Sequence, residues 1–289
     1  MVFGDHRVGA VPELQDPAIP SPHAGSGGDD GVTSTEVVEL TPEQIRAHDD
    51  QRDMGESGDT ALAAAYRRVF ADADRLLDVG GGSGAAVPAL SAAAPLVVVV
   101  DWSFTMLAVA EARARLRCAG DMRCLPFRNG TFDGVHAAYA VQNVSEWRSA
   151  IAECVRVCSA EAPVVMAWGG PPADERLAGI EAAYFAAVGG AAGVRAQRTG
   201  ITLDGAHDCF ASLGKPLADT FVIEGLQLRS PRQVVQRAAL NPFRSQPDEA
   251  AKAAAVTAAL AWAEGNIGPV DAPVNFRVVK VHHVYANSR

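Results

Sequence analysis

Short apolar runs mark the strands that the chain is expected to form. The runs at residues 76–79, 96–101 and 163–168 show almost no alternation of polar and apolar positions. Such continuous runs are typical of strands that are buried on both faces of a parallel sheet. Further strands are expected to begin at Asp133 and to cover residues 220–228 and 274–281.

Segments with a helical period lie between these strands. Thr41-Pro42-Glu43 combines an N-cap residue with proline at the first helical position, so a helix is expected to run from here toward Asp53. One face of a helix packed on the sheet is indicated by the spacing of Trp147, Ile151, Cys154, Val155 and Cys158. Other helices are expected at 59–73, 85–93, 104–117 and 204–213.

An acid and a glycine cluster follow the first apolar run, in the sequence Leu76-Leu77-Asp78-Val79-Gly80-Gly81-Gly82-Ser83-Gly84. A buried strand that ends in glycines lets a nucleotide approach the main chain at a tight turn. A carboxylate at Asp78 would repel the pyrophosphate of a dinucleotide, whereas it attracts the sulfonium and the ammonium of S-adenosylmethionine (SAM). The glycines alone decide little, because Gly80-x-Gly82-x-x-Ala85 also fits the dinucleotide-binding pattern.

A second acid, Asp101, ends the next apolar run, about twenty residues after the glycines. Ligands of open α/β sheets bind at the carboxyl ends of the strands, where such an acid can accept hydrogen bonds from both ribose hydroxyls. This feature suits SAM and NAD equally. Two more motifs follow, Gly-Asp-Met-Arg-Cys-Leu-Pro-Phe at 120–127 and Phe-Asp-Gly-Val at 132–135.

Together these four motifs resemble the class I SAM-dependent methyltransferases, in particular the small-molecule branch similar to the ubiquinone/menaquinone methylases. The motifs come in the family's order and spacing across about residues 60–170. The resemblance implies an α/β fold with a Rossmann-like seven-stranded sheet, mostly parallel with the last strand antiparallel. It also implies helices on both faces of the sheet, a helical substrate cap, SAM as the cofactor and S-adenosylhomocysteine as its product.

The resemblance further implies how this chain would hold the methionine and ribose parts of SAM. Gly80, Gly82 and Gly84 would pass under the methionine part. Asp78 would face the ammonium group, directly or through water, and Asp101 would hold the ribose hydroxyls.

The adenine contacts are implied in the same way. Asp121 would accept a hydrogen bond from the adenine amino group, and Met122 would offer its backbone amide to the ring. Trp102 and Met106 would pack against the adenine faces. The segment from Tyr139 to Gln142 would close the site near the transferable methyl group.

No general base can be carried over from the family. Many relatives have a His pair after the fourth strand, where this chain has Gln142-Asn143. A phenol or alcohol acceptor gains from a base within hydrogen-bond reach, whereas an amine needs only deprotonation and positioning. The catalytic candidates are His136, His207 and Tyr139, with Asp208 as a possible orienting group.

Other titratable residues are expected to be structural. His136 lies within a strand, and a hydrogen-bonded core position is the expectation favoured for it. His282 and His283 are expected to be peripheral, near the end of the last strand. Tyr66 is expected either to reach the cofactor or to hold its helix against the core.

Composition narrows the class of protein. A chain of 289 residues with 48% hydrophobic residues supports a large core, and a net charge of −9 disfavours nucleic acid as a partner. Five cysteines, without a tight cluster, indicate reduced thiols and a cytoplasmic protein. Cys154 and Cys158 lack further ligands at suitable spacing, so no metal site is expected. No membrane segment and no secretory signal are expected.

The expected organisation has four parts. Residues 1–35 are rich in Pro, Gly, Ser and Asp and are expected to form a disordered tail. Residues 36–73 are expected to form lid helices, and residues 74–168 the SAM-binding core. Residues 169–289 would complete the sheet, with cap insertions at about 169–203 and 229–270.

The sequence therefore predicts an enzyme that transfers the methyl group of SAM to an oxygen or nitrogen of a small, partly hydrophobic molecule. Natural-product biosynthesis is the predicted setting, and a monomer or homodimer the predicted assembly. Two alternatives stay open at this point. One is an NAD(P)-dependent oxidoreductase, and the other is a SAM-binding protein or cyclase on the same fold that transfers no methyl group.

Overall fold

A seven-stranded sheet forms the centre of the molecule, in a computed structural model that describes residues 40–50, 52–168, 174–188, 199–240 and 248–287. The strand order is β3-β2-β1-β4-β5-β7-β6. The first five strands pair in parallel, whereas β7 is antiparallel to both of its neighbours. The strands are β1 (Arg75–Val79), β2 (Leu96–Asp101), β3 (Leu116–Ala119), β4 (Gly134–Ala138), β5 (Val164–Ala167), β6 (Leu217–Arg229) and β7 (Val274–Tyr285).

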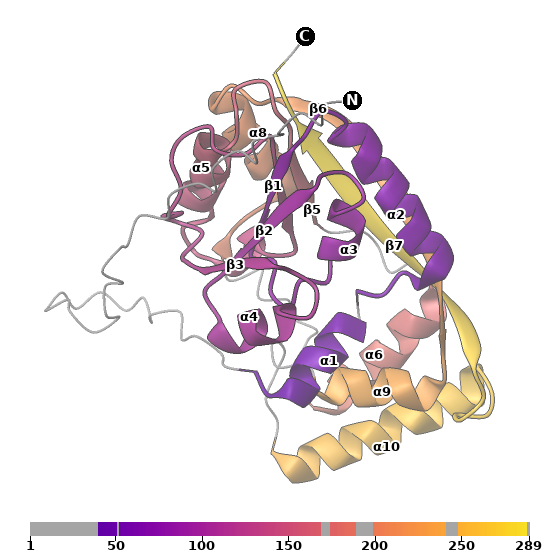
Figure 1. Cartoon of the computed structure of the whole chain (residues 1–289). Helices are drawn as coiled ribbons and strands as arrows, with labels where there is room; N and C mark the ends of the chain where they lie inside the picture. The colour runs from indigo at the N-terminus through magenta and orange to yellow at the C-terminus, as the bar shows by residue number, and fades with distance from the viewer. Residues whose placement is uncertain (1–39, 51, 169–173, 189–198, 241–247, 288–289) are drawn as a thin grey trace, which may run out of the picture.

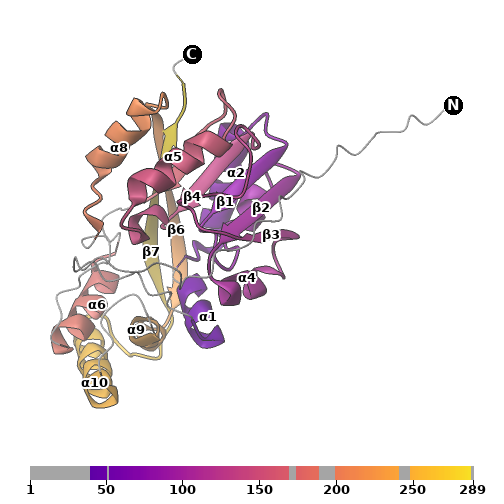
Figure 2. The same cartoon turned by 90° about the vertical axis from the view of Figure 1, so that its left-hand side faces the viewer.

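Helices cover both faces of the sheet (Figures 1 and 2), which confirms the predicted fold class. α2 and α3 pack on one face, and α5 and α8 pack on the other. The predicted tail at residues 1–35 lies outside the described residues. The helices are α1 (Pro42–Asp50), α2 (Gly55–Val69), α3 (Val87–Leu90), α4 (Phe104–Ala110), the 3₁₀ turn η1 (Val141–Asn143), α5 (Trp147–Val157), α6 (Glu175–Ala187), α8 (Leu203–Ser212), α9 (Pro231–Leu240) and α10 (Glu249–Asn266).

The alternation of side chains along β1 explains how one strand serves two cores. Leu76 belongs to the core under α2 and α3, whereas Leu77 and Val79 belong to the core under α5 and α8. Since successive side chains of a strand point to opposite faces, Asp78 lies on the α2 side with Leu76. A carboxylate is thereby placed inside the protein near the carboxyl end of the sheet.

A separate helical layer stands at one end of the sheet, where β6 and β7 extend beyond the shorter strands (Figure 1). α6, α9 and α10 share a third apolar cluster with Phe276 of β7. Trp262 packs so closely on Gly179 that a methyl group at position 179 would lie only 1.9 Å from the Trp262 ring. The two segments predicted to form a cap contain these three helices, and Trp262 serves to pack them. Phe243, an aromatic residue of the predicted cap segment at 229–270, lies outside the described residues.

Two predicted helices are shorter than the sequence suggested. The helix expected at 104–117 ends at Ala110, and Leu116 already begins β3. The helix expected at 85–93 is regular only over Val87–Leu90. Ala-rich turns flank both helices, and apolar alanines fit the helical pattern without requiring a helix. No helix in the described part of the chain is long and apolar enough to cross a membrane.

His282 and His283 are not peripheral, contrary to the expectation from their position near the chain end. Their exposed fractions are 1% and 4%. β7 lies between β5 and β6, so the last strand of the sequence is an interior strand of the sheet. The His282 ring stacks on Phe221, with centroids 4.7 Å apart and planes inclined by 3°.

We expect His282 to make folding sensitive to acid. Burial lowers the pKa of His282 to about 3, so the folded protein keeps it neutral where the unfolded chain would protonate it. Stability should therefore fall as the pH drops below about 6.5, by about 1.4 kcal/mol per pH unit from this residue until about pH 3. Urea unfolding at several pH values should give a shallower acid slope for His282→Phe, and equal slopes would contradict the assignment.

Candidate cofactor and substrate site

The turn after β1 is held against the end of β2. Gly80 and Gly82 adopt φ values of 62° and 56°, which favour glycine over other residues. The backbone N–H of Gly82 donates to Oδ2 of Asp101 over 2.9 Å, and that of Ser103 donates to Oδ1 over 2.9 Å. Burial raises the pKa of Asp101, although these two hydrogen bonds oppose the rise. Asp101 thus organises the turn while its carboxylate faces a cavity.

This first cavity has a volume of about 120 Å³ and lies at the carboxyl ends of β1, β2 and β4. Its walls include most of the residues that the sequence predicted for cofactor binding. These are Gly80, Gly82, Asp101, Trp102, Met106, Asp121, Met122 and Tyr139. The cavity therefore brings together side chains from four separate segments of the chain.

Asp121 has a strong protein partner at the edge of this cavity. Arg123 donates from Nη2 to Oδ2 of Asp121 over 2.6 Å, and the same guanidinium reaches Glu146 over 2.9 Å. The hydrogen bond to Arg123 and its charge lower the pKa of Asp121 against the effect of partial burial. Asp121 is therefore a fixed acceptor, and Arg123 is a neighbour that the sequence motif did not reveal.

The helix α1 lies over the first cavity. Leu40 and Ile45 share a small apolar cluster with Met106 of α4. Asp49 accepts a hydrogen bond from the Ser83 hydroxyl and forms an ion pair of 2.6 Å with Arg113. These contacts fasten the predicted lid segment to the glycine turn.

A second, larger cavity of about 360 Å³ adjoins the first. The two cavities share Arg52, Gly80, Gly81 and Tyr139 as lining residues, so they are contiguous. The second cavity lies between the sheet and α2, and its walls include Asp78, His136, Lys280 and His282.

Tyr139 separates the two cavities in a strained conformation. Its φ of 53° is the only positive value for a non-glycine residue in the described part of the chain. Such backbone strain is concentrated at functional sites and costs on the order of 1–3 kcal/mol. Asn143 donates from Nδ2 to the Tyr139 carbonyl over 2.8 Å and so supports this conformation. Asn143, one of the two residues in place of the family's His pair, thus has a structural contact here.

A buried chain of hydrogen bonds links Asp78, His136 and Tyr66. The β1–β4 register pairs Asp78 with His136, and His136 Nδ1 lies 2.7 Å from Asp78 Oδ1. On its other side, His136 Nε2 lies 2.7 Å from the Tyr66 hydroxyl. All three side chains are at most 2% exposed. The favoured expectation for His136, a hydrogen-bonded core residue, is confirmed, and Tyr66 holds α2 to the core through it.

The second oxygen of Asp78 has no partner. Oδ2 is buried and makes no hydrogen bond within the described residues. An unpaired buried carboxylate oxygen is costly, and Asp78 is also one of the residues that line the second cavity.

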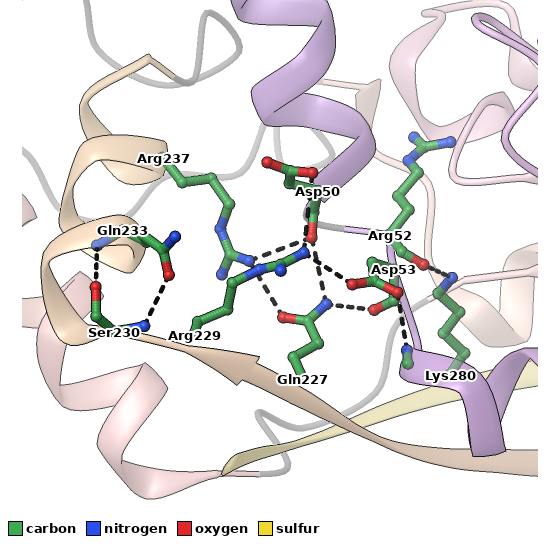
Figure 3. A network of polar contacts seen from close by, with 10 residues as sticks. Asp50, Arg52, Asp53, Gln227, Arg229, Ser230, Gln233, Arg237 and Lys280 are labelled. Carbon is green, nitrogen blue, oxygen red and sulfur yellow. Dashed lines mark hydrogen bonds and ion pairs between the residues drawn. The ribbon is translucent and has the colours of Figure 1, made fainter. Parts of the chain in front are cut away.

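The segment between α1 and α2 is held through its backbone carbonyl groups (Figure 3). Gln227 donates to the carbonyls of Asp50 and Asp53, and Lys280 donates to that of Arg52. The Arg52 side chain points away from this network. Its guanidinium carbon lies 5.4 Å from the Tyr139 ring centroid, and burial lowers its pKa. Side chains of β6 and β7 therefore present Arg52 to both cavities.

Three predicted site residues lie elsewhere. Gly84 and Gln142 line neither cavity, and the Gln142 carbonyl accepts a hydrogen bond from Thr199 over 3.2 Å. His207 also lines neither cavity, and its ring lies 5.3 Å from that of His283 and 5.8 Å from that of Tyr285. This position does not support the catalytic role predicted for His207.

Comparisons with known proteins identify the domain. The family profile described as "Methyltransferase domain" matches residues 77–166. A demethylmenaquinone methyltransferase of Renibacterium salmoninarum is 31% identical over 140 residues, which cover 46% of this chain and 58% of that protein. The ubiquinone/menaquinone biosynthesis C-methyltransferase UbiE of Methylobacterium nodulans is 36% identical over 136 residues, with coverage of 42% and 54%.

Solved structures share the fold. The crystal structure of the YcgJ protein from Bacillus subtilis superposes with a TM-score of 0.50 and 15% identity, covering 80% of this chain and 99% of that one. With the strand order and the antiparallel β7, these matches show that the chain contains a class I SAM-dependent methyltransferase domain. The matched part of the chain spans between 36% and 58% of the length of the curated relatives.

We expect His136 to be essential for stability. His136→Leu would leave both oxygens of Asp78 buried without a partner, and breaking a buried pair in this way costs about 3–5 kcal/mol. Tyr66→Phe removes only one hydroxyl and should cost about 1–2 kcal/mol. Denaturant unfolding of both variants tests this order, and an equal or reversed cost would contradict the central role of His136.

Proposed function

We propose that this protein transfers the methyl group of SAM to a small molecule. The observation that carries the proposal is the glycine turn held by Asp101 at a cavity, next to a second cavity with an unpaired Asp78 oxygen. The methyltransferase-domain match over residues 77–166 supports the same activity.

The residues of the two cavities suit the charges of SAM. Asp78 Oδ2 is a free acceptor for the ammonium group of the methionine part, and Arg52 offers a guanidinium for its carboxylate. Asp101 is suited to the ribose hydroxyls, while Trp102 and Met106 offer apolar surface for adenine. Cations and anions of the site thus complement a zwitterionic ligand.

Bound SAM would supply an electrophilic methyl group on a sulfonium. The protein's contribution would be to hold an acceptor against that group in a site with little water, since proximity converts an encounter into a near-intramolecular step. Tyr139 stands between the two cavities and is the residue best suited to align donor and acceptor. His136 has both ring nitrogens engaged, so we assign it a positioning role through Asp78.

For the acceptor, the structure supports a size class rather than a particular compound. A small molecule is supported by the cavity of about 360 Å³, which falls in the size range of small-molecule sites. Oxygen or nitrogen as the acceptor atom, the setting in natural-product biosynthesis and a monomeric or homodimeric state remain predictions from the sequence. Mass spectrometry of methylated products tests the first of them.

The alternatives are weakened to different degrees. The methyltransferase-domain match and the strand order argue against an NAD(P)-dependent oxidoreductase. A cyclase or regulatory protein that binds SAM without transfer is distinguished by turnover. Release of S-adenosylhomocysteine with a candidate acceptor supports transfer, and SAM binding without release under any acceptor would favour the alternative.

We expect Asp101→Ala to weaken SAM binding by more than tenfold. The variant loses charge-assisted hydrogen bonds worth about 1.5–3 kcal/mol each and also frees the Gly82 amide. Calorimetric titration with SAM measures the effect. Asp271→Ala is the control, because Asp271 pairs with Arg232 at an exposed position outside both cavities. Unchanged affinity in Asp101→Ala would overturn the ribose assignment.

We expect Gly82→Ala to weaken SAM binding at least tenfold with limited loss of stability. An added methyl group would lie 3.7 Å from Met106 and 3.9 Å from Asp101, both of which line the first cavity. Gly214→Ala is the matched control, since Gly214 also has a positive φ, 81°, and nothing within 4 Å of an added methyl group. Equal SAM affinity in the two variants would show that Gly82→Ala removes no space that SAM needs, and it would contradict the placement of the donor against this turn.

A further inference from the structure

The second cavity combines a wall of small apolar residues with a few charged groups. Alanines of the segment before α3 and of β4 and β5 line it together with Leu62 of α2. Donor binding would use Asp78 and Arg52. The remaining cation of the lining is Lys280 of β7, which holds the Arg52 backbone but has no direct contact with the donor in the site proposed above.

Lys280 forms no ion pair with a carboxylate in the described part of the chain, although the charges of Asp59 and Asp53 act on it from farther away. Within the described residues its Nζ donates to the Arg52 carbonyl, and no ion pair within 4.0 Å includes it. Burial first, and then the charge of Arg52, lower the pKa of Lys280 to about 8. A desolvated ammonium with one carbonyl partner is costly to maintain. Such a group in a cavity is a candidate for ligand binding.

Neither of the two carboxylates that line the same cavity, Asp59 and Asp78, forms an ion pair with Lys280. Asp78 is hydrogen-bonded to His136, and its free oxygen is complementary to a cationic group. Asp59 lies on the exposed side of α2 and forms no ion pair with Lys280. The cavity therefore has two cations, Arg52 and Lys280, and one available site for a positive charge. The carboxylate and the ammonium of SAM would match Arg52 and Asp78, which leaves Lys280.

We infer that the second cavity binds an acceptor that carries an anionic oxygen, a carboxylate or a phenolate, on a small apolar body, and that Lys280 binds this oxygen. The inference rests on the proposed methyl-transfer function. The apolar wall would take the body of the acceptor, while the ammonium would give it one orientation beside Tyr139. Charge recognition at one end of an apolar cavity is a usual way to fix the pose of a small ligand.

The competing explanation is that Lys280 merely secures the Arg52 carbonyl. Two substitutions separate the two roles. Lys280→Gln keeps a hydrogen-bond donor for the carbonyl but removes the charge, whereas Lys280→Arg keeps both. Lys252→Gln is the matched control, because Lys252 is a lysine of α10 that lines neither cavity.

The experiment uses the full chain and calorimetric titration at pH 7. S-adenosylhomocysteine is titrated first, and its failure to bind would overturn the proposed function independently of Lys280. Benzoate and benzamide, which share shape but not charge, are then titrated into the loaded protein. We expect benzoate to bind about tenfold more tightly than benzamide, as for a hydrogen bond to a charged group.

Lys280→Gln should lose this preference and keep its affinity for S-adenosylhomocysteine within about threefold. Lys280→Arg and Lys252→Gln should retain the preference. Equal binding of the two probes to the wild type, or a preference that persists in Lys280→Gln, would overturn the inference. A nitrophenol acidic enough to ionise below the pH at which Lys280 loses its proton, titrated on both sides of its own pKa, distinguishes a phenolate site from a carboxylate site.

A pH series tests the same point without relying on the folding of Lys280→Gln. Benzoate affinity in the wild type should fall by up to about tenfold as Lys280 loses its proton above about pH 8, while benzamide affinity stays constant. Arginine does not titrate in this range, so Lys280→Arg should show a flat profile. A flat profile in the wild type would contradict the binding of the anionic oxygen by Lys280.

On the neighbouring strand β6, the residue paired with Lys280 is Ile223, and its side chain does not titrate. The charged and titratable groups that interact with Lys280 are Arg52, Asp53, Asp59 and His282. Tyr66, Asp78 and His136 are further titratable residues of the same cavity lining.

Discussion

Asp78 and His136 lie side by side because β1 and β4 pair in parallel, and the hydrogen bond between them fixes a carboxylate inside the protein. One oxygen of Asp78 is held by the imidazole, and the other is buried without a partner in the described residues. Tyr66 continues the chain and ties α2 to the same point. The glycine turn, the lid segment and both cavities are arranged around this fixed charge.

The two cavities offer a ligand different sets of charged groups, with Arg52 common to both. The first has acids at strand ends, which suit hydroxyl and amino groups of a nucleoside. The second adds Lys280, which suits an anionic group, and Asp78, which suits a cationic one. Tyr139 stands at their boundary in a strained conformation that Asn143 supports. The strain is tolerated because the surrounding contacts determine the backbone there.

The sequence predicted those parts of the fold and site that depend on local patterns. The buried strands, the glycine turn and the strand-end Asp101 follow from residues within about twenty positions of each other, and their order identified the domain. The roles of Arg52 and Lys280 could not be predicted in this way, because their contact joins residues 228 positions apart. His282 was misjudged for the same reason, since its place in the sheet depends on strand order.

The anchoring of the α1–α2 connection has a consequence for how this protein can diversify. Gln227 and Lys280 bind main-chain carbonyl oxygens of this connection, and every amino acid supplies the same oxygen. The hydrogen bond from Lys280 to the carbonyl of residue 52 therefore does not depend on the side chain at that position. A substitution at position 52 can alter the chemistry offered to a ligand while the loop itself keeps its course. At position 52, therefore, the side chain can change while the backbone contacts that hold the connection stay the same.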